Sequence, residues 1–253
     1  MKASTYEAEA LIEATHWWFV GRRSLFATTI KRLCIPLEAR VLDVGTSTGT
    51  NLRMLRDAGF ARVEGLDISE HAIRWCAAKG LGPVTQGDVC NIPFGSETFD
   101  LVLATDVIEH VGDDRRALVE IHRVLKPGGY AIITVPAFRA LWGLEDEASQ
   151  HKRRYRANDV GRLIDAAGLL REDSFYFNYL LFVPVFLTRT LMRFVSHTAR
   201  TELEINSPSI NRFLTALFRI DVASAPVIKP RFGISYLAVV QRKQPCRPPY
   251  RRK

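Results

Sequence analysis

Between residues 40 and 135, short apolar segments of the strand type alternate with segments of helical periodicity. The expected strands cover 40–44, 61–67, a short segment reaching Asp88, 99–104 and 130–135, and the expected helices cover 48–58, 69–78 and 113–125. Strands that alternate with helices predict right-handed βαβ units, which build a largely parallel sheet with helices on both faces. This part of the chain is therefore expected to be an α/β core with a doubly wound sheet.

The segments that flank this core are expected to be mainly helical. A helix at 157–167 and a strand at 171–177 extend the core, and a last strand is expected at 234–240. The stretch between those two strands is longer than an ordinary connection, so we interpret it as an insertion. The expected parts are an N-terminal helical lid at 1–35, the core at 36–178, the helical insertion at 179–232, the closing strand at 233–241 and a disordered basic tail at 242–253.

The net charge of +8 is concentrated at the end of the chain. Residues 242–253 hold six basic side chains, three prolines and no acid, so the other 241 residues carry a net charge of only +2. This tail is expected to be solvated, and a contact with RNA or anionic lipid is the alternative interpretation. Because the rest of the chain is almost neutral, its composition argues against nucleic acid as the main partner.

Several features bear on compartment and metal content. The longest uncharged segment near the middle, 174–188, has 15 residues, which is fewer than the about 20 that a membrane-spanning helix needs. The N-terminus lacks the apolar core of a signal peptide, and the four cysteines show neither CxxC pairs nor zinc-ligand spacing. We therefore expect a cytoplasmic protein without a bound metal, although Glu109, His110 and His151 could converge on a magnesium ion.

The first expected strand ends in the loop Asp43-Val44-Gly45-Thr46-Ser47-Thr48-Gly49. In doubly wound sheets, ligands bind beyond the carboxyl ends of the strands, so this loop is the first place to look for a site. A dinucleotide fingerprint would need glycine at positions 47 and 50, where the chain has Ser47 and Thr50. The loop also contains no basic side chain for a phosphate. The sequence thus disfavours a nicotinamide oxidoreductase. It also disfavours a loop that binds the phosphates of a nucleoside di- or triphosphate.

The same loop resembles the DxGxGxG motif of class I S-adenosylmethionine-dependent methyltransferases. It matches at Asp43, Gly45 and Gly49 and departs at Ser47, where the family has a glycine. Further matches follow in order: Asp67 after the second strand, Gly87–Val89 after the third, Asp106–Val111 as a DVLEHV-type segment and Leu125–Gly129 as an LKPGG turn. The resemblance implies a Rossmann-like, doubly wound seven-stranded sheet, mostly parallel with an antiparallel last strand. It also implies S-adenosyl-L-methionine as cofactor and S-adenosyl-L-homocysteine as product.

The resemblance further implies which residues hold the cofactor. Asp67 matches the acid that accepts hydrogen bonds from both ribose hydroxyls, Asp88 matches the acid that accepts from the adenine amino group, and Arg22 could pair with the methionine carboxylate. The complete expected set is Arg22, Asp43, Gly45, Thr46, Ser47, Gly49, Asp67, Ile68, Asp88, Val89 and Asp106. The chemistry agrees, because a nucleoside without phosphate needs carboxylates and backbone amides rather than cations.

Three residues are expected at the end of the site where the methyl group leaves. Methyl transfer from a sulfonium is an in-line displacement, and a neutral oxygen acceptor must also lose its proton. His110 follows the fourth strand and is the first candidate base, with Glu109 as an alternative or orienting partner. His151 lies in a later loop that should face the same rim, and it is the second candidate base.

Two segments resemble a bacterial subgroup of these enzymes: His16–Arg23, which reads HWWFxxRR in that subgroup, and His151–Tyr155, which reads HxRRY. The expected substrate-binding residues are Trp17, Trp18, Arg154 and Tyr155. The tryptophans are implied as a lid that excludes water, and the other two as contacts for an anionic or polyhydroxyl acceptor. Ordinary core packing and a solvated basic loop remain the alternatives.

The resemblance implies methylation of a hydroxyl group on a small molecule, a sugar or a lipid-linked glycan-type acceptor. An RNA base or ribose methyltransferase is the alternative enzyme, although the [DN]PPY motif of amino methylases is replaced by Ala104–Val107. A non-catalytic nucleoside-binding regulator on the same fold is the alternative outside enzymes. The insertion at 179–232 is expected to cover an apolar acceptor, with a homodimer contact or a peripheral membrane contact as alternatives.

Overall fold

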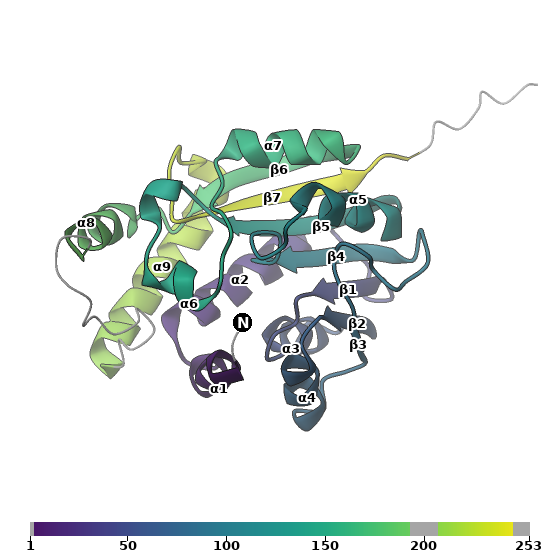
Figure 1. Cartoon of the computed structure of the whole chain (residues 1–253), viewed down its shortest axis with the longest axis horizontal. Helices are drawn as coiled ribbons and strands as arrows, with labels where there is room; N and C mark the ends of the chain where they lie inside the picture. The colour runs from purple at the N-terminus through teal and green to yellow at the C-terminus, as the bar shows by residue number, and fades with distance from the viewer. Residues whose placement is uncertain (1–2, 193–206, 245–253) are drawn as a thin grey trace, which may run out of the picture.

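The computed structural model describes residues 3–192 and 207–244, which contain one seven-stranded sheet in the order β3-β2-β1-β4-β5-β7-β6 (Figure 1). The strands are β1 Arg40–Val44, β2 Arg62–Asp67, β3 Val84–Gln86, β4 Phe99–Thr105, β5 Leu125–Pro136, β6 Leu169–Phe177 and β7 Ser235–Arg242. The pairs from β3 to β5 are parallel, and β7 is antiparallel to both of its neighbours. The expected fold class, a mostly parallel doubly wound sheet with an antiparallel last strand, is confirmed.

Helices cover both faces of this sheet (Figure 1). They are α1 Ala3–Ile12, α2 Trp17–Arg32, α3 Thr50–Asp57, α4 Glu70–Ala78, α5 Asp114–Val124, α6 Leu144–Ala148, α7 Ala157–Ala166, α8 Phe182–Met192 and α9 Pro208–Ile228, with a short 3₁₀ helix at Arg139–Leu141. Alternate strand side chains enter two separate cores. Leu42 and Val102 join the core beneath α5 and α7, whereas Val41 and Leu101 join the core beneath α2, α3 and α9.

The strand order reverses direction between β1 and β4. The chain leaves β1 to build β2 and β3 on one side, and it returns to build β4 and β5 on the other. Because all five strands are parallel, the loops at their carboxyl ends lie at one edge of the sheet, and the crevice at such a reversal is where ligands bind in open α/β sheets. The candidate site lies at this edge.

The LKPGG segment differs from the expected turn. Strand β5 begins at Leu125, which pairs with Phe99, and the register with β4 then shifts before Leu101 pairs with Tyr130. Gly128 has a φ of +81°, so the irregularity is absorbed in the glycine pair while the strand continues. The motif therefore starts a long central strand rather than separating a helix from a strand.

The segment expected as an insertion contributes to the body of the fold. Helix α9 packs against α2 and β6, and Phe218 and Val222 are buried in the core on that face. Asp221 of α9 accepts hydrogen bonds from the backbone N–H groups of Asn178 (2.6 Å) and Leu180 (2.8 Å), which fixes the chain where it leaves β6. In the parts of the chain that the structure describes, no helix combines the length and apolar character needed to cross a bilayer.

The last strand ends at Arg242, two residues beyond the strand expected at 234–240. Arg242 belongs to β7, where its guanidinium donates to the Leu125 carbonyl (2.7 Å) and pairs with Glu97 (2.6 Å), so this charge is not part of a solvated tail. The remainder of the expected basic tail from residue 245 onward lies outside the described residues.

Candidate active site

A cavity of about 400 Å³ opens at the carboxyl ends of β1, β2 and β4. Its wall combines the loop after β1, the ends of β2 and β4, the helices α1 and α2, the loop before α7, and one side of α8. The volume is in the range of a site for a small organic ligand. The cavity runs from the glycine loop at one end to Glu109, His110 and His151 at the other.

The glycine loop turns tightly beneath the cavity. Gly45 has a φ of +71°, and a Cβ atom there would lie 2.6 Å from a methyl carbon of Val107, so only glycine fits. Ser47 also has a positive φ of 47°, and its backbone N–H donates to Asp67 (3.0 Å). Its hydroxyl donates to Glu9 of α1 (2.7 Å). The serine that departs from the family pattern thus keeps the turn and fastens α1 over the loop.

Asp67 reaches the cavity with its carboxylate already oriented. One oxygen accepts from the Ser47 N–H and the other from the Ser69 N–H (2.9 Å). Burial raises the pKa of Asp67, and these amide hydrogen bonds oppose the shift. Asp88 and its neighbour Val89 also line the cavity, and Asp88 accepts from the Cys90 N–H (2.8 Å).

Most of the expected cofactor-binding set lines this cavity. The members in the wall are Arg22, Gly45, Thr46, Ser47, Asp67, Ile68, Asp88, Val89 and Asp106. Asp43 and Gly49 lie behind the wall instead. Gly49 stands just before the first residue of α3, with a φ of +89°.

Asp43 is fully buried on the α3 side of β1. One carboxylate oxygen accepts from the Asn51 side-chain amide (3.0 Å), and the other has no hydrogen-bond partner. Burial raises the pKa of Asp43 to about 7, and the negative charge of Asp67 adds to the rise. Because strand side chains alternate, Asp43 points into the α3 core rather than into the cavity.

Arg22 projects from α2 into the cavity. Its guanidinium lies 2.7 Å from an Asp106 oxygen and faces the rings of Trp18 and Phe26. Its Nε is buried without a hydrogen-bond partner. Arg22 is therefore already paired, yet it retains one donor that a bound carboxylate would satisfy.

The two tryptophans at the start of α2 line the cavity and also pack against the core. Trp17 and Trp18 both line the cavity, and the ring centroid of each lies 5.3 Å from that of Phe218 in α9. Gly21 permits this close packing, because a Cβ atom there would lie 2.0 Å from a Phe218 ring carbon. The aromatic segment is thus a packed wall of the cavity.

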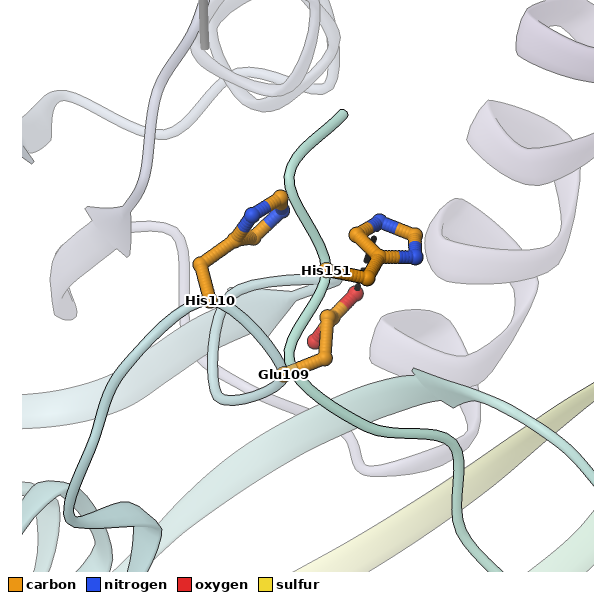
Figure 2. Close-up of side chains that lie close together, drawn as sticks. All are labelled: Glu109, His110 and His151. Atoms are coloured by element: carbon orange, nitrogen blue, oxygen red, sulfur yellow. Dashed lines mark ion pairs between the residues drawn. The ribbon is translucent and has the colours of Figure 1, made fainter. Parts of the chain in front are cut away.

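At the other end, Glu109, His110 and His151 converge, the first two from the segment after β4 and the third from the loop before α7 (Figure 2). The His110 and His151 ring centroids are 4.8 Å apart, and His151 Nε2 lies 4.0 Å from Glu109 Oε1. Glu109 is fully buried, and neither of its oxygens accepts a hydrogen bond. Burial raises the pKa of Glu109 well above its usual range, and the Asp106 charge adds to this.

The surroundings of His110 favour the neutral form of its ring. Burial, together with the neighbouring His151, lowers the pKa of His110 to about 4. The ring can still accept a proton as a reaction proceeds, but it is a weak base in the resting protein.

Asp146 of α6 organises the loop that carries His151. Its carboxylate accepts hydrogen bonds from His151 Nδ1 (2.8 Å), Arg154 Nε (2.7 Å) and the Gly143 N–H (2.8 Å). Burial by itself would raise the pKa of Asp146, but the hydrogen bonds from His151 and Arg154 lower it to about 2. Arg154 lines the cavity from this position, as the sequence suggested.

Tyr155 lies apart from the other expected substrate contacts. Its side chain is buried in the core beneath α5 and α7, outside the cavity wall. The hydroxyl is within hydrogen-bond distance of the Ile108 carbonyl (3.2 Å) and of Asp114 (3.0 Å). The expectation that Tyr155 binds substrate is therefore corrected: it supports the segment that carries Glu109 and His110.

Sequence reasoning missed several polar residues of the wall, among them Tyr6, Glu9, Asn178 and Arg189. They come from α1, the end of β6 and α8, and none lies in a motif, so only their polarity within apolar segments marked them. Several buried polar atoms without hydrogen-bond partners also gather here among the described residues, namely His16 Nε2, Trp17 Nε1, Arg22 Nε, both Glu109 oxygens and Asn178 Oδ1. Such a concentration fits a cavity that binds a polar ligand.

Known proteins match this architecture and part of the sequence. Residues 42–133 match the family described as a methyltransferase domain. A tRNA (carboxymethyluridine(34)-5-O)-methyltransferase of Arabidopsis thaliana is 33% identical over 45% of this chain and 26% of its own length. A demethylmenaquinone methyltransferase of Clavibacter sepedonicus is 32% identical over 45% of this chain and 48% of its own. The chain thus spans less than half the length of these two relatives.

The fold is shared more widely than the sequence. The crystal structure of an S-adenosylmethionine-dependent methyltransferase from Thermotoga maritima superposes with a TM-score of 0.58 and covers 95% of this chain and 96% of its own, at 20% identity. This likeness shows the sheet and its helices to be of the same type.

Proposed function

Because residues 42–133 match a family of methyltransferase domains, we propose that the chain is an S-adenosylmethionine-dependent enzyme that methylates a hydroxyl group of a small molecule, a sugar or a lipid-linked acceptor. The observation that carries this proposal is the continuous cavity, which joins the acids Asp67 and Asp88 to the cluster of Glu109, His110 and His151. A nucleoside site and a set of proton-accepting groups thus open into one space.

The nucleoside end fits the cofactor through groups that accept hydrogen bonds. Asp67 is held by two backbone amides and would accept from the ribose hydroxyls, while Asp88 would accept from the adenine amino group. The spare Nε of Arg22 would receive the methionine carboxylate. When bound, the cofactor supplies an electrophilic methyl group on a positively charged sulfur.

The opposite end fits a hydroxyl acceptor that must lose a proton. His110 is the first base we propose, His151 is the second, and Glu109 orients them. Arg154 and Arg189 add cationic groups to the same wall and suit a polyhydroxyl or anionic acceptor. Trp17 and Trp18 would exclude water from the reacting methyl group, as expected of a lid.

The apolar side of the cavity supports a small or lipid-type acceptor over a nucleic acid. Val185 of α8 lines the cavity beside the aromatic residues of α2, so part of the insertion would cover the acceptor. Exposed apolar residues on the outer side of α8 and α9, such as Leu187 and Phe213, offer a surface for the homodimer or membrane contact. The tRNA relative keeps an RNA acceptor as the second candidate.

Two measurements test this proposal. Calorimetric titration with S-adenosyl-L-homocysteine should give one site per chain, and NAD should give none. Methyl transfer from labelled S-adenosyl-L-methionine should then be screened against quinols, hydroxylated sugars, lipid-linked glycans and bulk tRNA. Binding without transfer to any class would favour the regulator, and transfer to tRNA alone would favour the RNA enzyme.

A further inference from the structure

Glu109 is a buried carboxylate that the folded chain leaves without hydrogen bonds. It is fully buried at the end of β4, and both of its oxygens lack a hydrogen-bond partner. Burying such a group uncompensated is costly, so a native structure that keeps it needs a reason, and a bound cation is one. His151 Nε2 lies 4.0 Å from Glu109 Oε1.

One of the two neighbouring histidines, His151, is oriented by a carboxylate behind it. His151 Nδ1 is 2.8 Å from Asp146, which leaves Nε2 directed toward Glu109 (Figure 2). A carboxylate behind one imidazole nitrogen is the arrangement that orients metal-binding histidines in proteins. His110 lies beside His151, with the two ring centroids 4.8 Å apart.

The three side chains are close enough to share one ion. One donor atom from each residue lies within 4.8 Å of the other two. Donors bound to one ion at about 2.1 Å lie about 3 to 3.5 Å apart, so the cluster needs to contract by about 1 Å. Side-chain rotation supplies such a movement without a change in the backbone.

We propose that Glu109, His110 and His151 bind one divalent transition-metal ion at the acceptor end of the cavity. Two imidazole nitrogens and one carboxylate oxygen favour zinc, iron(II), cobalt(II) or manganese(II) over magnesium, which prefers oxygen donors. Three protein ligands leave coordination positions open toward the cavity, as catalytic metal sites do. The sequence analysis named these three residues as a possible magnesium site but expected no bound metal, because 41 positions separate His110 from His151 and spacing rules detect neighbouring ligands.

The surrounding charges are compatible with a cation. The two arginines nearest Glu109 are each paired with an acid: Arg22 with Asp106 at 2.7 Å and Arg154 with Asp146 at 2.7 Å. Their positive charges are thus largely offset, and the carboxylate of Glu109 remains to balance the ion. Asp146 would also strengthen His151 as a ligand through its hydrogen bond.

The ion would act on the acceptor, and in this respect the inference rests on the proposed function. Bound to the ion, a hydroxyl oxygen of the acceptor would become more acidic and would release its proton to water at the mouth of the cavity. That oxygen then forms its bond to the methyl carbon while the carbon–sulfur bond breaks, and the sulfide leaves neutral. With the ion bound, His110 is a ligand, and the ion replaces it as the cause of deprotonation.

The test measures ion binding directly. The purified protein is stripped with a chelator, dialysed, and titrated with CoCl₂, followed by visible absorption and by calorimetry, and ZnCl₂ is then added as competitor. We expect one Co²⁺ per chain, with visible bands of nitrogen and oxygen ligation, and its displacement by Zn²⁺. Glu109→Gln and His151→Ala should each weaken binding at least tenfold, and the matched control His122→Ala, on α5 away from the cluster, should leave it unchanged.

The outcomes separate the metal site from the methyltransferase proposal. Absence of stoichiometric Co²⁺ binding by a folded wild-type protein would overturn the metal site, as would equal binding by the wild type and the two cluster variants. If methyl transfer persists in that metal-free protein, the proposed function stands with His110 as base. If S-adenosyl-L-homocysteine fails to bind the wild type, the proposed function fails, whatever the cobalt titration shows.

Discussion

The acids at the two ends of the cavity differ in their hydrogen bonding. At the nucleoside end, each oxygen of Asp67 accepts a backbone N–H before any ligand arrives. At the acceptor end, Glu109 is more deeply buried and accepts no hydrogen bond. Both acids follow parallel strands of one sheet, so the difference comes from the loops and not from the fold. At the nucleoside end, the chain alone supplies the hydrogen bonds that orient the acid. At the acceptor end, the acid Glu109 would gain partners only from a bound ion or ligand.

The largest expected effect is at the acceptor end. General-base catalysis supplies about 10²- to 10⁴-fold in rate, so His110→Ala should lower the turnover number by that order, whether His110 is base or ligand. Binding of S-adenosyl-L-homocysteine, measured by calorimetry, should change little, because the nucleoside end does not depend on this ring. The control is His122→Ala. Near-normal turnover of His110→Ala would assign the role of base to His151. Near-normal turnover of the double variant His110→Ala/His151→Ala would show that positioning of the acceptor alone suffices for methyl transfer.

Asp43 is the exception at the nucleoside end, because one of its oxygens is also unpartnered. Its pKa is raised to about 7 in the folded protein, first by burial, against an unfolded value of 3.8. Between these values the folded protein holds a proton that the unfolded chain has released, so its contribution to stability falls as the pH rises toward 7. Between pH 5 and pH 8, this loss amounts to about 3 kcal/mol.

Asp43→Asn removes the titrating group and keeps an acceptor for Asn51. Urea unfolding of the wild type and the variant at pH 5 and pH 8 should show a stability difference that shifts in favour of the variant at the higher pH. The comparison between the two proteins cancels the other titrating groups. An identical pH dependence of the two unfolding free energies would mean that Asp43 does not carry the shift.

Asp67→Ala tests the nucleoside end itself. Charge-assisted hydrogen bonds contribute about 1.5–3 kcal/mol each, so losing the carboxylate should weaken binding of S-adenosyl-L-homocysteine at least tenfold. The change also frees the Ser47 and Ser69 amides, and circular dichroism should confirm that the variant is folded. Unchanged calorimetric affinity would remove Asp67 from the cofactor site. Asp88→Ala, at the second acid of the cavity wall, is the matched comparison.

The contrast between the two ends also explains what the sequence reveals. Short apolar segments predicted β1 and β4, and the order of strands and helices predicted the parallel sheet, because these patterns are local. The position of Asp67 at a strand end was likewise readable from the chain. The Asp146 hydrogen bonds to His151 and Arg154 were not, because they depend on how an irregular loop folds back over β4.

The helical covers were the least predictable part. The contact between Glu9 and Ser47 joins residues 38 positions apart, and no pattern in α1 identifies its partner. The packing of α9 on α2 depends on Gly21 receiving the ring of Phe218, a close approach that only the folded geometry displays. Tyr155 was expected to contact the substrate for the same reason, because a loop motif does not indicate which of its side chains are buried in the core.

The smallest expected effect concerns the fastening of α1 over the nucleoside end. Ser47→Gly removes the hydroxyl that donates to Glu9 but relieves a non-glycine residue of its positive φ, and it keeps the backbone N–H that donates to Asp67. The lost hydrogen bond and the relieved strain are each about 1–3 kcal/mol and oppose each other, so cofactor affinity should change by only a few-fold. Hydrogen exchange of the α1 backbone amides should nevertheless become faster. The relieved strain stabilises the loop, whereas the lost hydrogen bond loosens the helix.

Thr48→Val, which removes the neighbouring contact with Glu13, is the companion variant. It should also make the exchange of the α1 amides faster. If α1 exchanges at the wild-type rate in both variants, these contacts do not hold the helix, and α1 is positioned by its packing against α4 instead.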